Sequence, residues 1–214
     1  MTDIFTEVDE DIRKERYLHL WKKYGPWAIA LAVLLVASVA GWQGWQAYQQ
    51  SQAEQASERY IEAARAIDEG ERGAALSTLD EIARPNASDT TLLAAFRQAE
   101  LMAQEGETGE AVAIWERIAE SSGPPPHFRS LATIYAVMHQ VEEGNPQALS
   151  ERLEPLAQSD DPFRHTALEL QALLAQKQGD DSRAAELYGR VVEGSGVPAA
   201  QRQRAEQMRA LLEG

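Results

Sequence analysis

The stretch that decides the fold is GETGEAVAIWERIA, residues 106–119, together with its counterpart GDDSRAAELYGRVV, residues 179–192. In each stretch a glycine and an acidic residue are followed by alanine at the sixth position, an aromatic residue at the tenth and a β-branched residue at the thirteenth. Steps of four and then three residues bring these side chains onto one face of an α-helix. The pattern therefore predicts a helix that begins directly after a glycine turn.

The same pattern occurs four times along the chain. Glycines at the expected helix ends, Gly70, Gly106, Gly144 and Gly179, are 36, 38 and 35 residues apart. Residues seven before and five after each glycine are mostly small, which lets antiparallel helices pack closely. Residues nine and twelve after each glycine are large or apolar. In that order the four sets are Ala63, Ala99, Val137 and Ala172; Ala75, Ala111, Leu149 and Ala184; Leu79, Trp115, Leu153 and Tyr188; Ile82, Ile118, Leu156 and Val191. The sequence predicts an all-α domain of about four helical hairpins over residues 49–196.

Local signals set the expected helix boundaries. Asn145-Pro146 and Asp161-Pro162 each place a capping residue before a proline at the first helical position. Residues 144–157 depart most from the repeat, because Leu149 replaces the small residue. The run 123–126, Gly-Pro-Pro-Pro, separates the second hairpin from the third, as a rigid loop or a slight hinge. Residues 197–214 are expected to form a capping helix with one apolar side, made of Ala205, Met208, Leu211 and Leu212.

This layout resembles the tetratricopeptide repeat, whose standard length is 34 residues, and the resemblance covers residues 56 to about 194. It implies a helical-hairpin solenoid that binds polypeptides on the concave face formed by the first helix of each pair. The lysine and asparagine residues with which some members hold acidic tails are missing. Some of the implied groove residues could instead belong to the core or be covered by the terminal helix. The groove positions implied are Tyr60, Phe96, Glu100, Ile134, Met138, Glu169 and Leu173.

The strongest local signal lies near the start of the chain, where no Asp, Glu, Lys, Arg or His occurs between Lys23 and Glu54. The apolar run from Trp27 to Trp45 would rise about 28 Å as a helix, enough for a bilayer core. Aromatic residues at both of its ends, Trp27 and then Trp42 and Trp45, suit headgroup depth. Residues 26–48 are therefore expected to be a transmembrane helix. A buried core helix, or a signal peptide cleaved after Ala40, are the alternatives.

The flanking charges predict the orientation of this span. Basic residues precede it, whereas only Arg59 follows within fifteen residues; those before it are Arg13, Lys14, Arg16, Lys22 and Lys23. The positive-inside rule then keeps residues 1–25 in the cytoplasm, as a basic segment that is either an amphipathic helix or a solvated tail. The repeats are expected on the far side, which is the periplasm in a Gram-negative cell. Membrane lipid is accordingly one expected partner.

The composition disfavours most kinds of chemistry. Thirty-four acidic against 20 basic residues give a net charge of -14, which repels nucleic acid. There is no cysteine, and the four histidines, His19, His127, His139 and His165, have no metal-ligand spacing. Acidic pairs before the expected helices, such as Asp180-Asp181, suit helix capping. We therefore expect no catalytic site, no cofactor, no metal and no small-molecule substrate.

The order of the segments along the chain gives a second resemblance to a known family. A charged start at residues 9–25, a span ending in Gly41-Trp42-Gln43-Gly44-Trp45, and degenerate hairpins resemble the YfgM-like ancillary subunits of the SecYEG translocon. This resemblance implies a single-pass bacterial inner-membrane protein that attaches to SecYEG and, with the PpiD chaperone, receives or hands on newly exported client polypeptides. A tetratricopeptide scaffold of another envelope or cell-division complex is the alternative.

Overall fold

The computed structural model of the chain describes residues 3–83 and 89–214, and in the first of these ranges it describes side chains at residues 27, 31 and 33–83. Its described residues form nine helices, so the all-α expectation is confirmed there. The chain divides into two compact units, Met1–Glu54 and Gln55–Gly214. The helices are α1 (Asp3–Asp68), α2 (Arg72–Ile82), α3 (Asp89–Gln104), α4 (Thr108–Glu120), α5 (Pro126–Gln140), α6 (Pro146–Gln158), α7 (Arg164–Lys177), α8 (Asp181–Glu193) and α9 (Ala199–Glu213).

The described part of the first unit is α1 up to Glu54, and the large apolar side chains described there are exposed. Trp27 is 77% exposed, Trp42 72% and Trp45 62%, and Leu31 and residues 33–36 are similarly open. No helix within the described residues has both the length and the hydropathy needed to cross a membrane. Residues 28–30 and 32 of the apolar run lie outside the described side chains. The same holds for the basic residues expected to set the topology, which are Arg13, Lys14, Arg16, Lys22 and Lys23.

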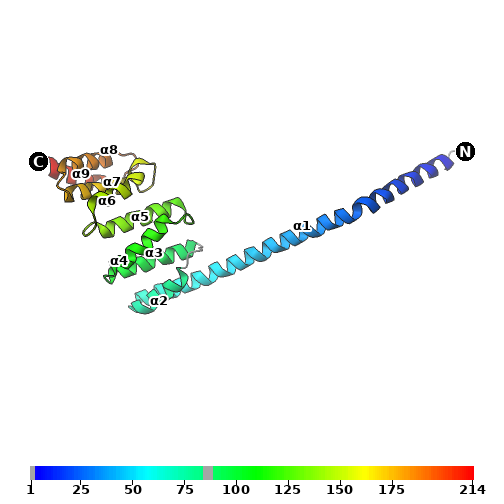
Figure 1. The fold of residues 1–214 in the computed structure, drawn as a ribbon, viewed down its shortest axis with the longest axis horizontal. Helices are drawn as coiled ribbons and strands as arrows, with labels where there is room; N and C mark the ends of the chain where they lie inside the picture. Colours follow the sequence, from blue (N-terminus) through cyan, green and yellow to red (C-terminus); the bar gives the residue numbers. More distant parts are fainter. Residues whose placement is uncertain (1–2, 84–88) are drawn as a thin grey trace. The chain divides into compact units, whose positions relative to one another are not determined.

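The second unit is a series of hairpins in which each helix packs against the next (Figure 1). The end of α1 with α2, α3 with α4, α5 with α6, and α7 with α8 make four pairs, and α9 packs on α8. Three of the four repeat glycines have the left-handed backbone, with φ of 80° at Gly70, 89° at Gly106 and 77° at Gly179. Glu71 N–H donates to Ala66 O at 2.7 Å, which is the six-to-one bond of a Schellman turn. The glycine signal thus marks the helix ends for a clear conformational reason.

Gly144, which lies four residues after the end of α5, differs from the other three repeat glycines. It is not among the glycines with positive φ. A side chain at this position would meet Gln140 O at 2.8 Å and the Leu149 Cδ1 atom at 2.9 Å. Glycine is needed here because the chain passes very close to the preceding turn.

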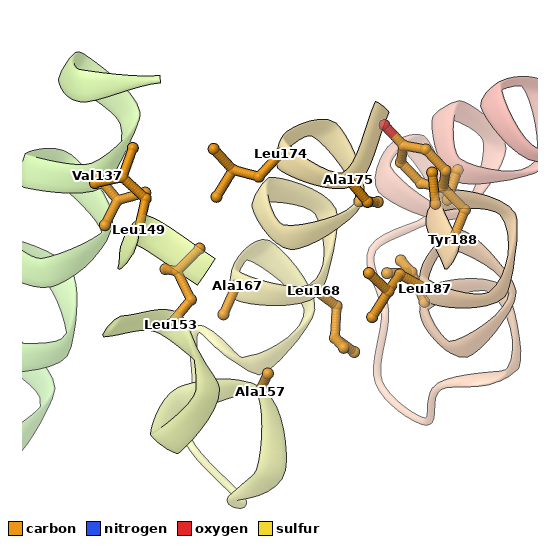
Figure 2. Packing of buried hydrophobic residues seen from close by; sticks show 14 of the residues in the cluster. Val137, Leu149, Leu153, Ala157, Ala167, Leu168, Leu174, Ala175, Leu187 and Tyr188 are labelled. Carbon is orange, nitrogen blue, oxygen red and sulfur yellow. The ribbon is translucent and has the colours of Figure 1, made fainter. Parts of the chain in front are cut away.

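The repeat positions form the core. Of the sixteen residues expected to be shared by the four hairpins, fifteen are buried and Leu156 is partly buried. All of them except Ala75 belong to three clusters: one around α1, α2 and α3, a second around Trp115 in α3, α4 and α5, and a third from α5 to α9. Figure 2 shows the third cluster, in which Leu149 and Leu153 of α6 face α5 and α7. The helix α5 contributes Ala132 and Ala136 to the second cluster and Val137 to the third, so it joins the two.

A repeated hydrogen bond links each hairpin to the next. The tenth residue after the first three repeat glycines is acidic, namely Asp80, Glu116 and Glu154. Each accepts a bond from a glutamine of a following first helix: Gln98 Nε2 to Asp80 at 3.2 Å, Gln140 Nε2 to Glu116 at 3.1 Å, and Gln171 Nε2 to Glu154 at 2.7 Å. Gln98 and Gln171 are buried, so these bonds also give their amide N–H groups an acceptor, whereas the buried Oε1 of Gln171 has no described partner.

Two local expectations were wrong. The helix α7 begins at Arg164 rather than at Pro162, because Asp161 is used elsewhere: its carboxylate accepts from Phe163 N–H at 2.8 Å and from the Ser130 hydroxyl at 2.5 Å. In α9, Ala205 is buried and Met208 and Leu212 pack on the core, but Leu211 is 77% exposed. Asn145 and Asp180 do cap their helices, accepting from Ala148 N–H and Arg183 N–H.

Candidate protein-binding surface

The seven residues implied for the concave groove lie in four different environments. Three are open to solvent: Glu100 on α3, Met138 on α5, which is 45% exposed, and Leu173 on α7, which is 37% exposed. Met138 and Leu173 stand six residues before Gly144 and Gly179, so they occupy the same position in successive repeats. These two apolar side chains are the strongest candidates for contact with a partner, and their binding role remains a prediction.

The aromatic members of the set are half-buried. Tyr60 packs against the first cluster, and Phe96 packs against the second. The Phe96 ring lies 6.1 Å from Tyr135 and 6.2 Å from Phe128, measured between centroids. Ile134 is buried in the third cluster, so its side chain belongs to the core and is not available to a partner. Ile134 is thus one of the implied groove residues that belong to the core instead, an alternative that the sequence left open.

Glu169 is covered by the C-terminal helix. Its side chain is only 14% exposed, and it accepts hydrogen bonds from Arg204 at 3.0 Å and Gln201 at 2.8 Å, both on α9. The bond to Glu169 holds the pKa of Arg204 above its usual value. Burial, and then the negative charge of Glu169, raise the pKa of Tyr188. The carboxylate that sequence reasoning placed in the groove therefore holds α9 in position.

The charge on this surface is acidic. Residues 55–214 carry fifteen arginines and lysines against twenty-seven aspartates and glutamates, and Lys177 is their only lysine. That lysine donates to Glu142 at 2.6 Å and so links α7 to the turn that follows α5. On α3, Arg97 pairs with Glu100 at 2.8 Å. A surface with apolar side chains and excess negative charge favours partners that are apolar and basic.

A separate cleft of about 650 Å³ opens between α2, α3 and α4, and we refer to it as the α2–α4 cleft. Its volume is within the usual range for ligand sites. Apolar side chains of α3 and α4 dominate the lining, and the loop before α5 closes one end. The lining residues are Asp80, Ala83, Asp89, Thr91, Leu92, Ala95, Gln98, Met102, Glu110, Ala113, Ile114, Arg117, Ile118, Ser121, Gly123, Pro124 and Pro125.

The described histidines have structural surroundings. The ring of His139 stacks on Trp115 with 4.7 Å between centroids, and His127 lies 4.5 Å from Phe128. His165 Nε2 is 3.1 Å from Ser195 O in the loop before α9. Within the described part of the chain, no group of three or more His, Cys, Asp or Glu residues is arranged to hold a metal ion.

Comparison with known families agrees with the helical architecture. The family model described as the tetratricopeptide repeat-like domain matches residues 19–210. The chain belongs to this family. No curated protein and no solved structure matches it significantly. The tetratricopeptide repeat-like region includes the apolar run from Trp27 to Trp45 as well as the hairpins, and domains of this kind are typically non-catalytic modules that bind proteins.

Sequence reasoning missed the α2–α4 cleft and the glutamine-to-acid bonds. The acidic residues themselves could have been found, because they recur at a fixed distance after the repeat glycines. Their partners could not, since Gln98 and Gln171 stand eight residues before a repeat glycine but Gln140 only four. The cleft depends on which side chains face the gap between α2 and α4, and the sequence alone does not show how these helices are arranged.

Proposed function

We propose that this tetratricopeptide repeat-like protein is a non-catalytic, membrane-anchored scaffold that serves as an accessory subunit of the SecYEG translocon. It would act with a periplasmic chaperone of the PpiD type on newly exported polypeptides. Its place would be the bacterial inner membrane, crossed once by residues 26–48, with residues 1–25 in the cytoplasm and the hairpins in the periplasm. The observation that carries the proposal is the order of the parts: a basic start is followed by an apolar helix and the hairpins, and one family match over residues 19–210 contains both of the latter.

The exposed apolar side chains of α1 support the anchor. Leu31, Leu34 and Val36 are each more than 60% exposed. Burying such a surface is worth about 25 cal/mol for each Å², so a helix of this kind is far more stable in lipid than in water. The anchor would keep the hairpins beside the exit of the channel and raise their effective concentration there.

The surface of the hairpins supports binding to unfolded chains. Exported polypeptides expose apolar residues before they fold, and Met138 and Leu173 offer an apolar contact at successive repeats. The excess of acidic residues around them keeps the scaffold soluble and favours basic segments. Placement of the client, rather than chemistry on it, would be the mechanism.

The proposal is tested by isolating the tagged protein from native membranes in mild detergent, beside a version whose residues 27–45 are replaced by an unrelated span. We expect SecYEG and a periplasmic chaperone to accompany the native protein and to be lost from the replaced version. Recovery of a different complex, equally with either span, would contradict the translocon role and favour a scaffold that binds through its hairpins alone.

The contact surface is tested by the double variant Met138→Glu/Leu173→Glu. Crosslinking to client polypeptides should fall while helical content is unchanged, because both side chains are exposed. Leu211→Glu is the matched control. Leu211 is exposed on α9, so this substitution also replaces an exposed apolar side chain by a carboxylate, but outside this surface. Equal crosslinking by both variants would place the contact elsewhere.

A further inference from the structure

The contacts between successive second helices show what the α2–α4 cleft lacks. Between α4 and α6, Arg152 donates to Glu116 at 2.7 Å. Between α6 and α8, Arg190 reaches Ala157 O at 3.5 Å. Both gaps are thus bridged by a guanidinium from the later helix. Among the hydrogen bonds and ion pairs described, none joins α2 to α4 in this way.

Arg152 and Arg190 occupy different repeat positions, the eighth after Gly144 and the eleventh after Gly179, so the two positions are compared separately. Arg152 is the eighth residue after Gly144, and Glu116, to which it donates, is the tenth residue after Gly106. One repeat earlier the corresponding acid is Asp80, but the eighth residue after Gly106 is Ile114. Ile114 lines the α2–α4 cleft and has no group to give to Asp80. Arg117, the eleventh residue after Gly106 and so the counterpart of Arg190, also lines the cleft, but no described bond joins it to Asp80, which accepts its described bond from Gln98.

Among the described residues, the cleft thus has an apolar floor and, at its side, an acid for which no ion pair is described. Leu92, Ala95 and Ile118 are buried in the second cluster and form the floor together with Ile114 and Met102. Among the described lining residues there are three carboxylates, Asp80, Asp89 and Glu110, and one cation, Arg117. The charge of this described lining is negative, and the bridge between Arg152 and Glu116 shows which group can bind an acid at this repeat position.

We propose that the α2–α4 cleft binds a short segment of a partner polypeptide that carries an arginine or lysine between apolar residues. The cation would take the place on Asp80 that Arg152 takes on Glu116, and the apolar side chains would pack on Leu92, Ile114 and Ile118. The inference rests on the protein-binding role proposed above but uses another face of the hairpins. It assigns the cleft a preference for cationic over anionic segments.

The test uses the full chain in detergent and a fluorescein-labelled synthetic peptide of leucine and serine with one central arginine, followed by fluorescence anisotropy. A peptide with glutamate at the centre is the matched probe. We expect the arginine peptide to bind about tenfold more tightly, the effect of one hydrogen-bonded charge pair. Equal binding of the two peptides, or no binding of either, would overturn the proposal.

Two variants test whether the peptide binds in the cleft. Ile114→Arg supplies the missing guanidinium from within the chain and should weaken peptide binding about tenfold. Thr78→Arg is the matched control, because Thr78 is the eighth residue after Gly70 and does not line the cleft. It should bind as the unmodified protein does. Equal weakening by both variants would mean that added positive charge alone repels the peptide, which would also overturn the proposal.

Asp80→Asn keeps an acceptor for Gln98 and removes the charge, so it should abolish the preference for the arginine peptide without unfolding the hairpin. The double variant Met138→Glu/Leu173→Glu should leave this preference intact. If the unmodified protein binds both peptides equally but the double variant loses client crosslinking, the cleft proposal is rejected and the proposed function is kept. If the unmodified protein prefers the arginine peptide but the double variant keeps client crosslinking, the role of Met138 and Leu173 is rejected and the cleft proposal is kept.

Discussion

The last two hairpins differ from the first two in how their cores are connected. From α5 to α9 the buried residues form one cluster, closed at its end by Ala205 of α9. In the first two hairpins the buried residues described divide between a cluster around Leu79 and another around Trp115, with the α2–α4 cleft beside them. Because each repeat is stabilised mainly by its neighbours, we expect the first hairpin to open more easily than the last two.

The largest expected effect is at the junction between the two regions. Trp115 is fully buried, and its ring stacks on Tyr135 with 5.4 Å between centroids. Trp115→Ala should lower the free energy of unfolding by about 3–5 kcal/mol in urea denaturation. Trp115→Phe keeps an aromatic ring and should lower it less. An equal loss from both variants would show that the second cluster does not depend on this packing.

The comparison itself is tested by one truncation in each region. Leu153→Ala and Leu79→Ala remove the same atoms from the same position of two repeats, and both side chains are fully buried. Leu153→Ala should lower global stability by about 2–5 kcal/mol. Leu79→Ala should instead speed amide exchange mainly in α2 and leave α6 to α8 protected. Uniform acceleration in both variants would mean that the hairpins open as one unit.

The two kinds of repeat glycine give a smaller and more specific contrast. Gly106→Ala strains a left-handed residue with no atom within 4 Å of the new side chain and should lower stability by about 1 kcal/mol. Gly144→Ala should lower it by about 1–3 kcal/mol through overpacking. Asparagine tolerates the left-handed region, so Gly106→Asn should lower stability less than Gly106→Ala. At the crowded position, Gly144→Asn should lower stability more than Gly144→Ala. The same order at both positions would contradict the two explanations.

Detaching the cap should have a moderate effect. Glu169→Ala removes the bonds from Arg204 and Gln201, and because Arg204 is largely exposed we expect a loss of about 1 kcal/mol, seen as a lower melting temperature. Glu213→Ala breaks the pair with Arg209 inside α9 and is the control, with no measurable change expected. A melting temperature unchanged in Glu169→Ala would show that α9 is held by its apolar contacts alone.

The smallest expected effect is at alkaline pH. The pKa of Tyr188 is raised in the folded chain, so the stability that its neutral hydroxyl contributes is present below the ordinary value of 10.0 and is lost as the pH rises above it. Tyr188→Phe should make the melting temperature less sensitive to pH above about 10. Below that pH, the melting temperatures of the unmodified protein and of Tyr188→Phe should change with pH in the same way. Identical alkaline profiles would contradict this account of Tyr188.

Much of the fold could be predicted because helical spacing converts directly into burial. The residues at fixed distances from the repeat glycines, such as Ala111 and Trp115, are buried as expected. The start of α7 could not be predicted, since Asp161 bonds to Ser130, thirty-one residues earlier. Ile134 was carried over as a groove residue, but α5 faces two clusters and buries it. Glu169 likewise has its partner on α9, which local sequence does not reveal.

The measurement that tests the central claim most directly is the accessibility of single cysteines, which this cysteine-free chain makes clean. One variant carries Thr2→Cys before the basic segment, and the other Glu186→Cys on the exposed side of α8. In intact cells with a permeabilised outer membrane, an impermeant maleimide should label only the cysteine at 186. Labelling at position 2 alone, or at neither position until the inner membrane is broken, would contradict a periplasmic scaffold anchored by α1.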